Sequence, residues 1–271
     1  MRLYAGLAYA FLYLPIAVIV AFSFTAGRSA SELRGFSLQW YGTALSNPFV
    51  TGALQTSLVI ALLSASLATL TGTAAALGLE RLRGPWRALL DALIYVAIMV
   101  PGIVIGIATL IALVTVFDAL NPVLAAAWPA LLGSPPRLGL GLGSVVAAHG
   151  LFGMALCVVV VRARLASLDP ALLEASADLY ADPWTTFRRI TLPQLAPAIL
   201  AAFLLAFTFS FDDFIVAFFV AGPNTTLPIY VFSSIRRGVT PEINAIGTMV
   251  LLVSLALTLV IQRLLRPAGE R

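Results

Sequence analysis

Residues 162–194 read RARLASLDPALLEASADLYADPWTTFRRITLPQ, a polar segment between two long apolar stretches. Two aspartate–proline pairs stand in it, at Asp169 with Pro170 and at Asp182 with Pro183. An aspartate can cap the free N–H groups at a helix start, and a proline suits the first helical turn. The segment therefore predicts two short helices that meet at a sharp corner and lie along a membrane face rather than crossing it.

The first of these helices is expected over Ala171–Tyr180 and the second from Trp184 to about Thr191, with Pro193 ending or kinking the second. An ordinary amphipathic connector would have the same pattern, because the apolar residues of the two helices do not reveal what they pack against. The residues alone leave this alternative open.

Outside this segment the chain is strongly apolar. Hydrophobic residues make up 61% of its 271 residues and charged residues only 10%, whereas a soluble domain carries roughly a quarter charged residues. Stretches long enough to cross about 30 Å of hydrocarbon lie at about 5–24, 54–79, 88–116, 142–161, 196–220 and 243–264. The first could also be a signal peptide, but its length favours an uncleaved span. We therefore predict an all-α membrane protein with about six transmembrane helices and a single domain over 1–271.

The arginines predict the orientation. All sixteen basic residues are arginine, and a cytoplasmic N-terminus puts eleven of them inside and five outside, as the positive-inside rule requires. The inside arginines are Arg2, Arg81, Arg83, Arg87, Arg162, Arg164, Arg188, Arg189, Arg263, Arg266 and Arg271. Both termini and the segment 162–194 are then cytoplasmic, so we interpret the net charge of +4 as membrane topology and expect no nucleic-acid partner.

Several chemistries are excluded by composition. Without lysine the chain has neither the phosphate-binding lysine of a P-loop nor a Schiff-base amine. A single cysteine, Cys157, and a single histidine, His149, exclude an intramolecular disulfide and a His/Cys zinc site within one chain. We expect no metal site and no catalytic residues.

The loop also resembles a known family. Glu174-Ala175-Ser176 followed by Ile190-x-Leu192-Pro193 is similar to the "EAA" loop of ABC importer permeases, whose pattern has three residues, a glycine and nine residues between these blocks. One position departs from the pattern, because Tyr180 stands where the glycine normally serves the corner between the helices. We expect residues 181–183 to make the corner instead.

The resemblance extends beyond the loop, and the second permease subunit of spermidine/putrescine-type importers is the most similar type. The matching stretches are Gly35-Phe36 with Trp40-Tyr41, His149 to Arg164-Leu165, Ser210-x-Asp212-Asp213, Gly222-Pro223, Leu227-Pro228-Ile229-Tyr230, and Gly238 with Pro241-Glu242-x-Asn244-Ala245.

The resemblance implies a multi-pass protein of the bacterial inner membrane that is not itself an enzyme. It would pair with a second, non-identical permease subunit. Two ATPase subunits would bind ATP and magnesium, and a periplasmic or lipoprotein receptor would deliver the solute. The coupling loop would be about 162–195. Its coupling residues are expected to be Glu174, Ala175, Ser176, Asp178, Tyr180, Ile190, Leu192 and Pro193.

Polar groups inside the apolar stretches are candidates for a solute path, because a carboxylate in hydrocarbon must face protein or water. Asp212 and Asp213 would lie in the outer half of the fifth span, where they either line the path for a cation or serve as packing and interfacial groups. The candidate path residues are Asp212, Asp213, Phe211, Pro101 and Tyr230, with Glu242 and Asn244 at the outer mouth, where they bind the receptor or are simply solvated.

Expectations for Pro101, Gly102, His149 and Asp91 complete this set. Pro101 would bend the third span, while Gly102 counts against a polyamine, because polyamine permeases often carry an acid there. His149 is expected to be a hydrogen-bonded packing residue. Asp91 is expected to pair with Arg87, four residues earlier.

The expected function is thus an importer permease for a polyamine or a related amine. The alternatives are an importer of a phosphonate, an amino-acid-like or a ferric solute, an ion-coupled secondary transporter, an intramembrane serine protease with a serine facing His149, and a scaffold without transport activity.

Overall fold

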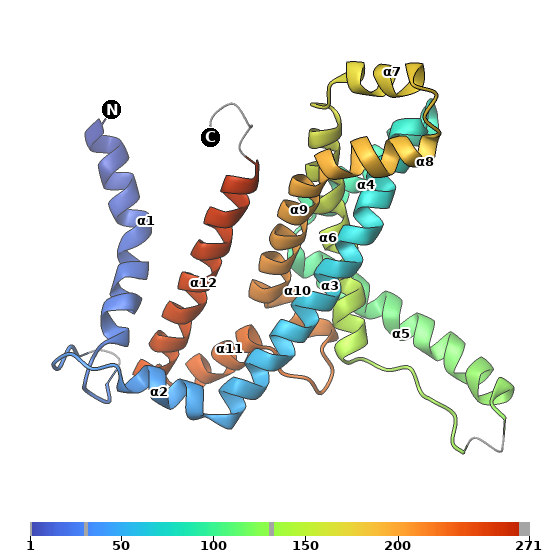
Figure 1. Ribbon diagram of the computed structural model, residues 1–271. Helices are drawn as coiled ribbons and strands as arrows, with labels where there is room; N and C mark the ends of the chain where they lie inside the picture. The colour runs from blue at the N-terminus through green and yellow to red at the C-terminus, as the bar shows by residue number, and fades with distance from the viewer. Residues whose placement is uncertain (1, 30–31, 130–132, 266–271) are drawn as a thin grey trace. The chain divides into compact units, whose positions relative to one another are not determined.

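The computed structural model describes residues 2–29, 32–129 and 133–265 (Figure 1). Within these ranges the regular structure is helical, apart from one isolated bridge between Thr25 and Phe36. Six helical segments are long and apolar enough to cross a membrane, which confirms the all-α membrane fold. Arg266 and Arg271, counted above on the cytoplasmic side, lie outside the described residues.

The helices in chain order are α1 (Arg2–Ser23), α2 (Gln39–Ser46), α3 (Pro48–Arg81), α4 (Pro85–Met99), α5 (Gly102–Ala127), α6 (Leu142–Leu165), α7 (Pro170–Asp178), α8 (Pro183–Thr186), the π-helical turn η2 (Phe187–Thr191), α9 (Leu192–Asp212), α10 (Ile215–Val220), α11 (Leu227–Arg237) and α12 (Pro241–Leu265).

Contacts divide the chain into two units. The first combines Met1–Thr56 with Thr225–Ala256, and the second combines Ser57–Asn224 with Leu257–Arg271. The expectation of a single domain stays a prediction.

Small residues bring α3, α6 and α9 together in the second unit. A Cβ atom on Gly153 of α6 would lie 2.9 Å from Ala68 Cβ of α3 and 3.4 Å from Ala206 Cβ of α9. A Cβ atom on Gly72 of α3 would lie 2.6 Å from the Cβ of Cys157 on α6. Such close backbone approach is typical of helix packing in membranes. These three helices are the framework that holds the loop of residues 162–194 at one end.

Two of the expected continuous spans are broken, so the predictions for 88–116 and 196–220 are wrong as single helices. α4 ends at Met99 and α5 begins at Gly102, because Pro101 has no N–H and the preceding Val100 is held extended, with ψ 132°. Pro101 therefore breaks its span rather than bending it. The fifth span ends at Asp212, before α10 begins.

The two broken spans pack against each other. A Cβ on Gly106 of α5 would lie 2.7 Å from the ring of Phe219 in α10, and one on Gly102 would lie 3.8 Å from Ile215. A glycine at 106 is therefore needed for α5 to approach α10 this closely.

In the first unit, side chains hold the connection between α1 and α2. Trp40 Nε1 donates to the carbonyl of Thr25 at 2.9 Å, and the hydroxyls of Ser23 and Tyr41 lie 2.7 Å apart. Phe24 stacks on Phe36 with ring centroids 5.2 Å apart. The dipeptides Gly35-Phe36 and Trp40-Tyr41 quoted from the sequence thus contribute three aromatic side chains to this turn.

Candidate functional site

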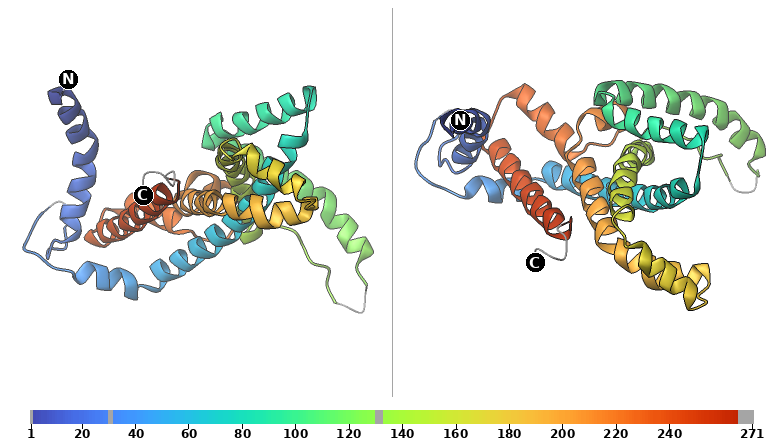
Figure 2. Two further views of the ribbon diagram at one scale, coloured as in Figure 1. Left: turned by 45° about the horizontal axis from the view of Figure 1, so that its top comes forward. Right: turned by 90° about the horizontal axis from the view of Figure 1, so that it is seen from above.

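The loop between α6 and α9 begins as its first aspartate–proline pair predicts. Asp169 caps α7, its Oδ1 accepting the N–H of Ala171 at 3.0 Å, and Pro170 is the first helical residue. Glu174 is exposed on this helix and forms no ion pair within the described part of the chain. Figure 1 and the right view of Figure 2 show α7 and α8 standing out from the end of the α6 and α9 pair.

The corner after α7 is made by Tyr180, so the expectation that residues 181–183 make it is wrong. Tyr180 has a φ of +57°, the only positive value among the described non-glycine residues. The Ala181 N–H donates to Ser176 O at 3.1 Å and the Tyr180 N–H donates to Ala177 O at 2.9 Å. This is the Schellman pattern that ends many helices, normally with glycine at the left-handed position. Tyr180 thus occupies the left-handed position that glycine normally fills.

The second pair also starts a helix. Asp182 Oδ1 accepts the N–H groups of Trp184 and Thr185 at 3.0 and 3.1 Å, and Oδ2 accepts the Thr185 hydroxyl at 2.6 Å. These bonds, first of all the one from the Thr185 side chain, lower the pKa of Asp182 below its ordinary value.

Pro193 does not end this second helix. Helical structure runs from Pro183 to Asp212 over 30 residues, and the turn before the proline widens into η2, where Leu192 N–H donates to Phe187 O. Pro193 has no N–H to donate to the preceding turn, and the wider π-helical turn lets the helix continue through the proline. The chain bends at η2 as α8 leads into α9 (Figure 1), so the kink alternative holds and α8 is joined to the fifth span without a loop.

Hydrogen bonds make the loop a rigid unit. Ser176 is buried, and its Oγ lies 2.7 Å from the Oγ1 of Thr186, which ties α7 to α8. Arg164 Nε donates to Gln194 O at 3.1 Å, which ties the two ends of the loop. Of the expected coupling residues, Ser176 therefore faces the interior of the loop rather than its surface.

The outer surface of the loop is apolar for a protein segment in water. Leu179 is 81% exposed, Tyr180 97% and Trp184 67%. We call these three residues the tip. Ala175, Asp178, Leu192 and Pro193 are also exposed, whereas Ile190 is half-buried. Exposed apolar patches next to polar residues mark interaction sites, so the tip is a candidate docking surface.

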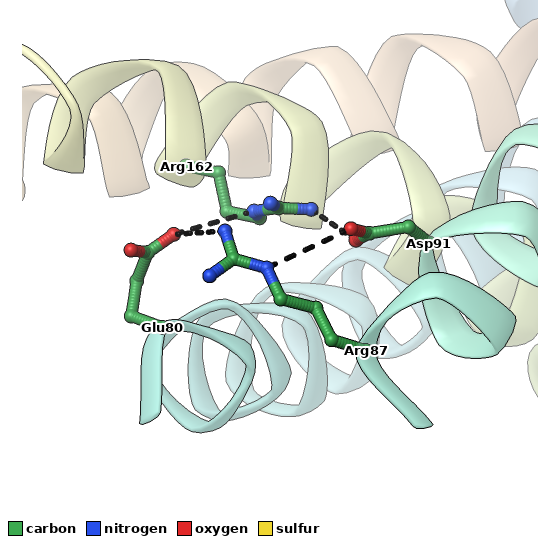
Figure 3. A network of polar contacts seen from close by, with 4 residues as sticks. All are labelled: Glu80, Arg87, Asp91 and Arg162. Atoms are coloured by element: carbon green, nitrogen blue, oxygen red, sulfur yellow. Dashed lines mark hydrogen bonds and ion pairs between the residues drawn. The ribbon is translucent and has the colours of Figure 1, made fainter. Parts of the chain in front are cut away.

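A network of four charged residues joins α3, α4 and α6 near the start of the loop (Figure 3). Arg162 contacts Asp91 at 2.5 Å and Glu80 at 3.5 Å. Arg87 lies 3.9 Å from both acids. The predicted pairing of Asp91 with Arg87 is confirmed, but the closer partner, Arg162, is 71 residues away, and no local pattern in the sequence indicates it.

A second polar chain crosses the helix framework. His149 Nδ1 lies 2.7 Å from the Oγ of Ser210, which lies 2.8 Å from the Oγ of Ser64. His149 Nε2 lies 3.2 Å from Asp213 Oδ2, within ion-pair distance but outside hydrogen-bond geometry. Asp213 Oδ2 also accepts the Ala217 N–H at 3.0 Å, which starts α10. His149 is thus the hydrogen-bonded packing residue that was predicted.

Ser210 is the serine that an intramembrane protease would need beside His149, and the sequence did not reveal it. Ser210 is only 6% exposed and its oxygen is already in contact with both Ser64 and His149. A nucleophile must reach its substrate, so this arrangement fits a structural tie between α3, α6 and α9.

The two aspartates have different surroundings. Asp213 faces His149, while Asp212, the last residue of α9, is exposed. Phe211 is buried and stacks on Phe207 with centroids 6.0 Å apart. Of these three candidates for a solute path, only Asp212 presents its side chain outward.

Glu242, expected at the outer mouth, and Tyr230, a candidate path residue, meet in the first unit. Asn47 Nδ2 donates to Glu242 Oε1 at 2.9 Å and to the hydroxyl of Tyr230 at 3.4 Å. Asn244 is 8% exposed. Glu242 and Tyr230 therefore share one amide partner, whereas Asn244 lies inside the packed helices.

Comparison with known proteins gives consistent matches. Residues 68–268 match the family model described as "Binding-protein-dependent transport system inner membrane component". The chain is 35% identical over 259 residues to the spermidine/putrescine transport system permease protein PotC of Escherichia coli K12, covering 95% of this chain and 90% of that one. It is 38% identical over 248 residues to the putrescine transport system permease protein PotI of the same strain, covering 90% and 83%.

Solved structures show the same fold. A chain of a bacterial ABC transporter that imports the acidic polysaccharide alginate superposes with a TM-score of 0.69 at 16% identity, covering 98% of this chain and 95% of that one. A chain of an amino acid ABC transporter superposes with a TM-score of 0.56 at 17% identity, covering 82% and 95%.

Proposed function

The chain belongs to the inner membrane components of binding-protein-dependent transport systems, and from this premise we propose that it is one permease subunit of an ATP-driven importer of polyamines, spermidine or putrescine. The carrying observation is the identity of 35% and 38% to two permeases that are named for these substrates. The partner permease is proposed to be a different chain. A periplasmic or lipoprotein receptor delivers the amine, with the Glu242 carboxylate as a contact at the outer side.

ATP hydrolysis belongs to two partner ATPase subunits in this proposal, and this chain transmits motion. Its tip supplies the apolar contact, and Glu174, which has no ion-pair partner among the residues the structure describes, supplies a carboxylate for an arginine of the ATPase. The loop transmits motion rather than absorbing it, because the hydrogen bonds of Ser176 and Arg164 fix its two helices and its two ends.

The structure also offers a direct mechanical route. The helix from Pro183 to Asp212 has 30 residues, about 45 Å of helix axis at 1.5 Å per residue. It joins the docking surface to the break at Asp213 without an intervening loop. A displacement of α8 therefore moves the exposed carboxylate of Asp212, which is how closure of the ATPases would open the path.

Asp212 is the proposed contact for the cationic substrate. An ammonium group of the substrate would be held by a charge-assisted hydrogen bond to this carboxylate. Asp213, engaged by His149 and by the start of α10, fixes the break and thereby the position of Asp212. Because a glycine, Gly102, stands at the first position of α5 in place of an acid, the partner permease would supply the remaining anionic contacts.

The test is uptake by the whole complex, receptor and ATPases included, in proteoliposomes. Labelled putrescine and spermidine are compared with an amino acid, a phosphonate and a ferric chelate. We expect uptake of an amine that requires ATP and the receptor, a raised KM in Asp212→Asn, and recovery in Asp212→Glu. Uptake of another solute only would reject the polyamine, and uptake driven by an ion gradient without ATPase would reject the importer.

A further inference from the structure

A cavity of about 610 Å³ opens between α3, α4, α5 and α6 in the second unit. Its walls include Leu79, Leu82, Leu93, Val104, Phe152 and Val158. The volume is in the range of ligand pockets in proteins, about 300–1,000 Å³. No coupling, path or outer-mouth residue lines the cavity. Val100, the neighbour of Pro101, does line it.

The cavity is unsuited to a charged solute. Among its lining residues Thr109 has the only hydroxyl, and no lining residue is charged. A cation or a cluster of water molecules would find a single side-chain hydroxyl there and no charged partner, too few groups to replace its hydration. The occupant that this chemistry selects is a hydrocarbon chain.

Its length corresponds to one leaflet. On α6 the lining residues extend from Ala148 to Val158, about 15 Å at 1.5 Å per residue, which is half of the roughly 30 Å hydrocarbon core. On α3 the lining ends at Leu82, in the turn after the helix. The arginine distribution predicts that this turn is cytoplasmic, so the cavity opens toward the inner leaflet, and its far end at Ala148 lies beside His149, at the level of Asp213.

The same turn carries unpaired positive charge. Leu82 stands between Arg81 and Arg83, both exposed, and neither has an ion-pair partner among the described residues. Arg87 and Arg162, by contrast, are held by Glu80 and Asp91 (Figure 3). The two free arginines thus stand at the cytoplasmic mouth of the cavity. Basic pockets between membrane helices on the cytoplasmic side bind anionic lipid head groups.

We propose that this cavity binds an acyl chain of an anionic glycerophospholipid of the inner leaflet, with the lipid phosphate at Arg81 and Arg83. The chain lies against Val100 and Val104, on either side of the break between α4 and α5, and against α6. The lipid fills the space that side chains leave open beside the break and so fixes the spacing of α4 from α6.

The head-group test uses a double variant that combines Arg81→Gln and Arg83→Gln. Its control is Arg137→Gln, which changes an exposed arginine in the loop before α6. The complete complex is reconstituted in nanodiscs of phosphatidylglycerol and phosphatidylcholine, and retained lipid is counted by native mass spectrometry after detergent extraction. We expect the double variant to lose affinity for phosphatidylglycerol about 30-fold and Arg137→Gln to retain it. Equal retention in all three proteins would overturn the proposal.

The cavity test keeps both arginines and fills the space. Ala108 lines the cavity, while Ala119 is exposed on the same helix outside it. Ala108→Phe is expected to release the retained lipid and Ala119→Phe to keep it. A cross-link from Ala108→Cys to a helix of the partner permease, with no retained lipid in the native complex, would show a protein occupant and refute the lipid site.

Discussion

Replacing Tyr180 by glycine tests how the corner of the loop is stabilised. Tyr180 is held at a φ of +57°, a conformation that costs a residue with a Cβ about 1–2 kcal/mol. Glycine avoids this cost but loses about 0.5–1 kcal/mol through its freedom in the unfolded chain. The side chain is 97% exposed, so little packing is lost. Tyr180→Gly should therefore stabilise the corner by about 1 kcal/mol.

Hydrogen exchange in the intact complex measures this difference. The N–H groups of residues 180 and 181 donate the two bonds that close the corner, and 1 kcal/mol corresponds to about a fivefold slower exchange. Tyr180→Ala is the matched control, because it removes the ring but retains the strained φ, and its exchange rate should remain near that of the unaltered chain. Faster exchange in Tyr180→Gly would refute the assignment of strain to this residue.

The same pair of variants separates geometry from docking. If the ring of Tyr180 contacts the ATPase, both variants lose coupled uptake to the same extent, even though only the glycine variant has a more stable corner. Unchanged uptake in both would exclude the ring from the docking surface.

Three further predictions concern the coupling loop and the helix framework. Glu174→Ala should leave membrane insertion and ATP hydrolysis intact while abolishing uptake, and normal uptake would refute its role. Gly72→Ala should lower the thermal midpoint of the purified complex, because its Cβ would lie 2.6 Å from that of Cys157 and such overpacking costs about 1–3 kcal/mol of stability. Gly78→Ala on the same helix meets nothing within 4 Å and should not lower the midpoint. Hydrogen bonds lower the folded-state pKa of Asp182, so the start of α8 is fully stabilised above pH about 4 and loses this stabilisation as the pH falls through the lowered pKa. Protection of the amides at that helix start, taken relative to the intrinsic exchange rate at each pH, should therefore fall in acid in the unaltered chain and stay constant in Asp182→Asn. An equal loss of protection in both proteins would contradict this.

Sequence reasoning succeeded where structure is decided locally. The aspartate–proline pairs start α7 and α8 as expected, because capping and the φ of proline act within one turn. The lengths of the apolar stretches predicted six membrane-spanning segments, because hydropathy is also a property of one continuous stretch of sequence. The pairing of Asp91 with Arg87 also needed only helical spacing.

It failed where a distant element decides. The break at Asp213 depends on a side chain that starts α10 and faces His149 of α6, which hydropathy does not register. The contact of Arg162 with Asp91 and the contact of Ser210 with His149 join helices far apart in the sequence. The family pattern places the corner at position 180, and the structure has the corner there. The tyrosine at that position misleadingly suggested another corner, although a Schellman turn tolerates a tyrosine at a modest cost.

The burial of Cys157 has a practical consequence. Its side chain is inaccessible between α3, α6 and α9, and the chain has no other cysteine. Maleimide and spin-label reagents will therefore react with engineered thiols alone, so paired probes can follow movements of the permease during turnover in an otherwise natural sequence. The residue that fills the helix framework can stay in place, and no cysteine-free background has to be built.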